Sequence, residues 1–223
     1  MQLLNIALGS FYSFIIFLFL SIYFYPGSSH ADKASQIYNF NYNFLSDLGL
    51  TIVYSGEQNF ISSTLFVFAT TCVCIGLTSY FLALPVILNK GLFSQRLSQI
   101  GSIFGIMCGF AFMGVGLTPH NYYPEAHMFS VKLGFQLFLI VMLFHSLAIY
   151  KNKIDLSKNT IWVYIFFMLV LCFHIYLLNW GPSIGEGNGL LIKVVWQKIT
   201  VIGLSMTIFT QSYILKKYIQ SLS

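Results

Sequence analysis

The chain has 223 residues, of which 57% are hydrophobic and only 8% are charged. Soluble domains carry roughly 25% charged residues, so this composition excludes a cytosolic enzyme, a nucleic-acid-binding module and a secreted disulfide scaffold. The net charge of +5 does not indicate a nucleic-acid partner, because the 11 Lys and Arg residues are spread along the chain. We expect membrane lipids as partners, no nucleic acid and no cofactor.

Six apolar runs occupy most of the chain, and each is long enough to cross a bilayer core of ~30 Å as a helix. The runs cover residues 6–25, 60–88, 98–118, 128–149, 161–179 and 191–215. They predict an all-α integral membrane protein with one domain, residues 1–223, built as a six-helix bundle. The first run is longer than the roughly 7 to 15 apolar residues of a secretory signal, which favours a retained first span, with cleavage near Ser29-His30-Ala31 as the alternative.

The connections between these runs differ in charge. Five of the six acidic residues lie in the connections of one side, and the basic residues gather on the other. Positively charged connections stay in the cytoplasm, so the pattern predicts a multi-pass protein of the cell membrane with both termini cytoplasmic. The basic residues of the predicted cytoplasmic side are Lys90, Arg96, Lys151, Lys153, Lys158, Lys216 and Lys217.

The only long connection, residues 26–58, carries a short segment in which apolar and polar residues alternate. This segment, Asn43–Leu50, predicts a short amphipathic helix that lies on the outer surface of the bundle. Tyr and Phe residues flank it, as is typical of the membrane interface.

The predicted third helix has a stripe of small residues, Gly101, Gly105 and Gly109, at four-residue spacing. Such a stripe lets helix backbones approach closely in lipid. It predicts tight packing within the bundle, with homo-oligomerisation through the same face as the alternative.

Polar and ionisable residues gather toward the outer ends of the predicted helices, where burial in the membrane demands an explanation. They predict an outward-facing polar pocket that binds a ligand. The alternative is that Asp47 pairs with Lys198 as a structural lock. The candidate ligand-binding residues are Asn43, Ser46, Asp47, Asn59, Ser63, His127, Lys132 and Lys198.

A weaker pattern concerns metal binding. Asp47, His120 and His127 offer carboxylate and imidazole ligands of the kind that zinc prefers. The two histidines lack the helical spacing of a zinc motif, so the pattern makes these residues weak metal candidates only.

Several short motifs resemble a bacterial and archaeal six-helix membrane family known as domain of unknown function 998. The motifs are Tyr25-Pro26-Gly27, Asn43 to Gly49, Asn59 with Ser62, Ser63 and Phe66, and Gly114 to Pro119 followed by His127. The resemblance implies the six-helix fold and a cluster of polar residues at the outer face, here Asn43, Ser46, Asp47, Gly49, Asn59 and His127. It also implies a prokaryotic cytoplasmic membrane as the location, and it implies no reaction. The chain departs from the family in its longer stretch between Gly27 and Asn43 and in His120, and a more distant likeness to the DRAM-like membrane proteins is an analogy only.

The residues support three hypotheses for function. The first is a protein that recognises a lipid headgroup or small polar molecule in the outer pocket. The second is a membrane-embedded, metal-dependent lipid hydrolase or transferase that uses Asp47, His120 and His127. The third is a structural protein in which Asp47 is sealed against Lys198 and no cavity is present. Whether the protein is an enzyme stays open at this point.

Overall fold

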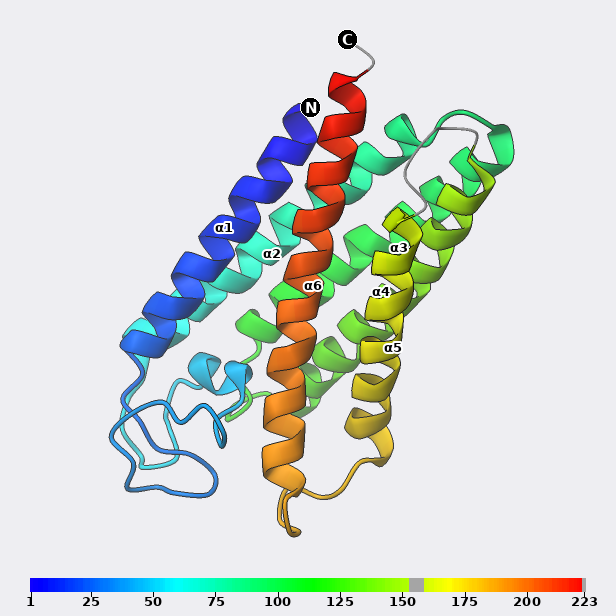
Figure 1. The fold of residues 1–223 in the computed structure, drawn as a ribbon. Coiled ribbons are helices and arrows are strands. Elements are labelled where there is room, and N and C mark those ends of the chain that lie inside the picture. The colour runs from blue at the N-terminus through cyan, green and yellow to red at the C-terminus, as the bar shows by residue number, and fades with distance from the viewer. Residues whose placement is uncertain (153–158, 222–223) are drawn as a thin grey trace.

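The computed structural model describes residues 1–152 and 159–221 of the protein. These residues form six long α-helices and one short 3-10 helix, η1 (Figure 1). All six α-helices are long and apolar enough to cross a membrane, so the predicted six-helix membrane bundle is confirmed. The elements are α1 (Gln2–Tyr23), η1 (Leu45–Gly49), α2 (Phe60–Ile87), α3 (Leu92–Leu117), α4 (Pro124–Lys151), α5 (Asn159–Trp180) and α6 (Gly189–Gln220).

Several helices extend beyond the apolar runs. Helix α3 begins at Leu92 rather than at residue 98, and α6 continues to Gln220 rather than ending at residue 215. The added turns carry polar residues such as Arg96 and Lys216. A helix continues past the hydrocarbon because its backbone hydrogen bonds are satisfied internally, while polar side chains reach the headgroups or water.

The two ends of the bundle differ. Both termini of the chain lie at the same end, which we call the terminal end (Figure 1). The opposite end carries the long segment 24–59 and the α3–α4 and α5–α6 connections, and we call it the loop end. Of the basic residues predicted for the cytoplasmic side, Lys90, Arg96, Lys151, Lys216 and Lys217 belong to the terminal end, whereas Lys153 and Lys158 lie outside the described residues.

The glycine stripe of α3 is used inside the bundle. A Cβ at Gly101 would lie 2.7 Å from Cε1 of His145 on α4, and a Cβ at Gly105 would collide with the ring of Phe81 on α2. All three glycines of the stripe are buried. Helices α2 and α4 of the same chain therefore occupy this face, which argues against homo-oligomerisation through it.

The short helix of the long segment is present, but its position differs from the prediction. Leu45, Asp47, Leu48 and Gly49 of η1 are all buried, and the element packs against α2, α3 and α6. It therefore closes the loop end of the bundle rather than lying on the surface. The physical reason is that the Leu45 and Leu48 side chains are buried among the helices, while the polar atoms of Asp47 are satisfied within the segment.

Helices α1 and α6, which come from the two ends of the chain, are neighbours. The ring of Phe209 on α6 contacts Phe11 and Tyr12 on α1, with ring centroids 6.1 and 4.9 Å apart. The two helices run antiparallel (Figure 1). In this register, Lys198 of α6 lies opposite Ile22, in the last turn of α1.

Candidate functional site

A buried polar cluster lies at the loop end, and Asn43 is its centre. The side chain of Asn43 is fully buried; its Nδ2 donates to the Ser28 carbonyl at 2.8 Å and to Oδ2 of Asp47 at 3.1 Å. Its Oδ1 accepts from the backbone N–H of Asn39 at 2.8 Å. Asn43 thus joins three parts of the long segment to one another.

The Asp47 carboxylate is held by three donors. Besides Asn43, the backbone N–H of Phe44 donates to Oδ2 at 3.0 Å and the Tyr54 hydroxyl donates to Oδ1 at 3.2 Å. Burial is the dominant effect on this group and raises the pKa of Asp47 to about 6, although these hydrogen bonds and Lys198 act in the opposite direction. Burial, and then the charge of Asp47, raise the pKa of Tyr54. Asp47 can therefore change its charge near neutral pH.

Lys198 reaches this cluster from α6. Its Nζ donates to the backbone carbonyl of Asn43 at 2.6 Å and lies 5.5 Å from the ring centroids of Tyr38 and Phe40. Within the described chain, Lys198 and Asp47 form no ion pair within 4.0 Å. The predicted direct pairing of Asp47 with Lys198 is therefore wrong. The reason is that hydrogen-bond donors of the long segment itself satisfy the Asp47 carboxylate.

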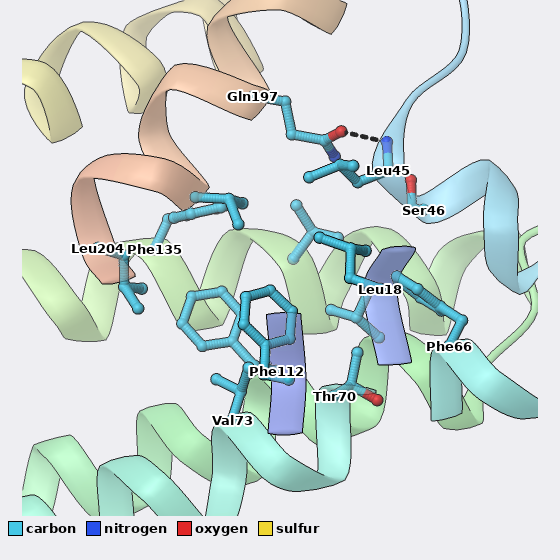
Figure 2. Close-up of a pocket in the computed structure, with 14 residues that line it drawn as sticks. Leu18, Leu45, Ser46, Phe66, Thr70, Val73, Phe112, Phe135, Gln197 and Leu204 are labelled. Carbon is cyan, nitrogen blue, oxygen red and sulfur yellow. Dashed lines mark hydrogen bonds between the residues drawn. The ribbon is translucent and has the colours of Figure 1, made fainter. Parts of the chain in front are cut away.

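A second contact joins α6 to the segment. Gln197 Oε1 accepts from the backbone N–H of Leu45 at 2.8 Å (Figure 2). Gln197 and Lys198 are adjacent on α6, and both bind backbone groups at the start of η1. The long segment therefore fastens α6 to the rest of the bundle at the loop end.

Asn59 and Ser63 have a structural place at the start of α2. Asn59 is buried and its Nδ2 donates to the carbonyls of Leu48 and Leu50, at 3.0 and 2.7 Å. The Ser63 hydroxyl donates to the Asn59 carbonyl at 2.6 Å. The Asn59 side chain therefore holds the end of η1 on α2, whereas Ser63 bonds only the backbone at the start of α2.

His127 and Lys132, the two candidates on α4, lie elsewhere. His127 is buried, and its Nδ1 lies 2.8 Å from the Thr118 carbonyl, which can only accept, so Nδ1 carries the proton. The ring of His120 packs edge-on against it with centroids 5.3 Å apart. Lys132 is half-buried and makes no hydrogen bond to the other candidates in the described structure.

The weak metal candidates do not form one site. The structure brings His120 and His127 together, but no group of three or more His, Cys, Asp or Glu residues in the described chain could hold a metal ion. Asp47 instead uses its oxygens within the Asn43 cluster. The metal-dependent hydrolase therefore lacks an assembled ligand set.

Beneath η1 lies an apolar cavity of about 80 Å³ (Figure 2). Helices α1, α2, α3, α4 and α6 line it together with Leu45 and Ser46 of η1. Two polar groups of its lining are engaged, since the Thr70 hydroxyl donates to the Val67 carbonyl and Gln197 Oε1 accepts from the backbone N–H of Leu45. Ser46 is thus the one predicted binding residue that faces this cavity. An apolar cavity of this size suits a hydrocarbon group rather than ordered water.

A second hollow of about 260 Å³ lies between α1 and α6. It begins at Lys198 and Phe40, and continues along α6 to Phe209. Exposed apolar side chains on both helices line it, so it opens to the outside of the bundle between α1 and α6. We call this hollow the α1–α6 groove. The exposed members are Phe19, Phe40, Ile202 and Met206.

The cavity and the groove lie back to back. Phe14, Leu18, Leu45 and Val201 line both of them and form the wall between them. A rearrangement of these side chains would join the two into one apolar space. The polar candidates sit at the loop end of this space, and Lys198 is the only one of them that also lines the groove.

Sequence reasoning did not include Tyr38, Tyr54, Phe40 or Gln197 among the site residues. The aromatic residues of the long segment indicated only a membrane interface, and Gln197 carries no motif. The groove has no sequence signal, since it depends on α1 and α6 lying side by side. Only the proximity of Lys198 to the outer end of α6 could have suggested a site there.

In comparisons with known proteins, no family model, no curated protein and no solved structure matches the chain. The resemblance to the family known as domain of unknown function 998 therefore stays an expectation. The geometry of the loop end and of the α1–α6 groove carries the functional proposal.

Proposed function

We propose that the protein binds the acyl chain of a membrane lipid in the α1–α6 groove. The observation that carries the proposal is an apolar groove that opens sideways between two membrane helices and backs onto an apolar cavity. Ligand sites are concave and mostly apolar, with a few placed polar groups. A hydrocarbon chain is the molecule that a side opening in a membrane bundle meets at the highest concentration.

The length of the groove supports this occupant. From Lys198 to Phe209, α6 rises by about 16 Å at ~1.5 Å per residue. This is about half of a hydrocarbon core of ~30 Å, which is the depth of one leaflet. A chain that belongs to one leaflet would therefore fill the groove from the loop end to the middle of the bilayer.

The proposal predicts that filling the groove prevents lipid binding. Val201→Trp places an indole in the wall between groove and cavity, and we expect it to reduce the lipid retained through detergent purification by at least about ten-fold. Native mass spectrometry measures the bound fraction after a lipid of one defined chain length is added.

Leu169→Trp is the matched control, because Leu169 lies exposed on α5, outside both hollows. It should bind lipid as the unmodified protein does. Equal lipid binding by folded Val201→Trp and Leu169→Trp proteins would overturn the proposal.

We also propose that the terminal end faces the cytoplasm and that the protein belongs to the prokaryotic cell membrane. The charge asymmetry supports this orientation, with Lys90, Arg96 and Lys151 at the terminal end and Glu57 and Glu125 at the loop end. The groove would then serve the outer leaflet.

Cysteine labelling tests this orientation. We expect a membrane-impermeant maleimide, added to intact cells, to label Glu57→Cys at the loop end but not Lys90→Cys at the terminal end. Both positions are exposed, and the unmodified chain serves as the background because its four cysteines belong to helices. Labelling of Lys90→Cys alone would reverse the orientation.

A further inference from the structure

We propose that Lys198 selects lipids with an anionic headgroup, by binding the headgroup while the acyl chain lies in the α1–α6 groove. This inference rests on the proposed function and deepens it, because it names the class of lipid. It follows from the donors of Lys198, the surroundings of its ammonium group and its depth in the bundle.

The ammonium group of Lys198 has donors to spare. An ammonium has three N–H groups, and the Asn43 carbonyl is its one hydrogen-bond acceptor in the described structure. The nearest carboxylate, Asp47, is engaged by three other donors and makes no ion pair with it. Lys198 thus presents a cation that lacks a direct anionic partner, and an anion that contacts it would gain a charge-assisted hydrogen bond.

The surroundings of Lys198 favour an anion over a cation. The rings of Tyr38 and Phe40 each lie 5.5 Å from Nζ, so their faces already stabilise the positive charge of the lysine. The positively charged group of choline or ethanolamine would be repelled by the Lys198 ammonium. A phosphate or carboxylate would be attracted to it. Such a group could reach Lys198 through the groove, because Lys198 lines it.

The depth of Lys198 suits a headgroup. Helix α1 has 22 residues and therefore measures about 33 Å, just enough to span a core of ~30 Å. Lys198 lies opposite the last turn of α1, because Phe209 meets Phe11 and Tyr12 farther along the same antiparallel pair. The ammonium is thus near the edge of the hydrocarbon, where lipid phosphates begin, and the groove continues from there toward the bilayer centre.

The test compares two lipids with identical acyl chains, phosphatidylglycerol and phosphatidylcholine, added to the detergent-solubilised protein and measured by native mass spectrometry. We expect the unmodified protein to bind phosphatidylglycerol at least about ten-fold more tightly. Lys198→Gln keeps a donor for the Asn43 carbonyl and removes the charge, so it should bind both lipids equally. Lys198→Arg keeps the charge and should keep the preference even where Lys198→Gln proves unstable. Lys193→Gln, on the same helix but outside the groove, should also keep it.

The outcomes separate this inference from the proposed function. Binding of both lipids with equal affinity by the unmodified protein would overturn the selectivity and leave the acyl-chain site standing. Binding of neither lipid would overturn both. A preference that survives in Lys198→Gln would overturn the role of Lys198, whatever Lys193→Gln shows.

Discussion

Asp47→Ala is expected to lower the free energy of unfolding by about 3–5 kcal/mol, which is a large loss for a single substitution. The change removes the acceptor of three hydrogen bonds, so the donors on Asn43, Phe44 and Tyr54 are left without it. Each unsatisfied buried donor costs about 1–3 kcal/mol. Urea unfolding of the detergent-solubilised protein at pH 7, followed by circular dichroism, measures the loss.

Asp47→Asn is the control for shape and hydrogen bonding. Its side-chain oxygen can accept from Asn43 and Phe44, and its amide can donate to the Tyr54 hydroxyl. It should therefore keep most of the stability that Asp47→Ala loses. Equal stability of Asp47→Ala and the unmodified protein would mean that the cluster does not hold the loop end together.

The second large effect is a dependence of stability on pH. Burial raises the pKa of Asp47 from 3.8 to about 6, so the folded protein binds the proton more tightly than the unfolded chain does. The resulting stabilisation is fully present below about pH 3.8 and is lost as the pH rises through about 6. At about 1.4 kcal/mol per pKa unit, the whole shift amounts to about 3 kcal/mol, most of which is lost between pH 4 and pH 7. Unfolding curves at four pH values across this range measure it.

Asp47→Asn isolates the carboxylate in this experiment too. The other titratable groups that face Asp47 are Tyr25, Tyr38, Tyr54 and Lys198, and all of them are present in both proteins. The pKa values of the three tyrosines are raised, so their hydroxyls stay neutral over this range. The free energy of unfolding of the unmodified protein, minus that of Asp47→Asn, should therefore decline as the pH rises. A difference that stays constant from pH 4 to pH 7 would contradict the raised pKa.

A link to the proposed lipid selectivity follows from the same geometry. Protonation of Asp47 removes a negative charge that acts on Lys198, whose own hydrogen bond is to the Asn43 carbonyl and not to the carboxylate. The charge of Lys198 is then opposed by fewer negative groups, which strengthens its attraction for an anionic headgroup. The cluster thus couples the charge of a buried carboxylate to the open end of the groove.

Much of the fold was predictable because the bilayer imposes strict local rules. A spanning segment must be long, apolar and helical, and the six runs met these conditions without reference to one another. The ends were less predictable, since polar turns at Arg96 and Lys216 continue the helices past the apolar runs. The short helix was recognised from its pattern, but alternating residues do not distinguish a helix on the surface from one wedged between helix ends.

The candidate site was predictable only in its residue types. Lys198 was identified because charges are rare in membrane spans, and Asp47 because it joins the polar residues near the outer ends of the helices. Both belong to the loop-end cluster. Their hydrogen-bond partners could not be identified in the same way. Lys198 donates to a backbone carbonyl 155 positions away, and every residue has such a carbonyl, so no sequence pattern indicates which one is used. For the same reason, no sequence pattern indicated that Gln197 would bind the backbone N–H of Leu45.

By itself, the sequence determined that this protein is a bundle of six membrane helices with polar residues gathered toward one end. The tertiary structure decided which helices are neighbours. As a result, Phe81 and His145 pack against the glycines of α3, polar residues join the long segment to α6, and an apolar groove lies between α1 and α6. The reason is physical. Spanning a bilayer is a property of each segment alone, whereas a cavity is a property of the space between segments that lie far apart in the chain.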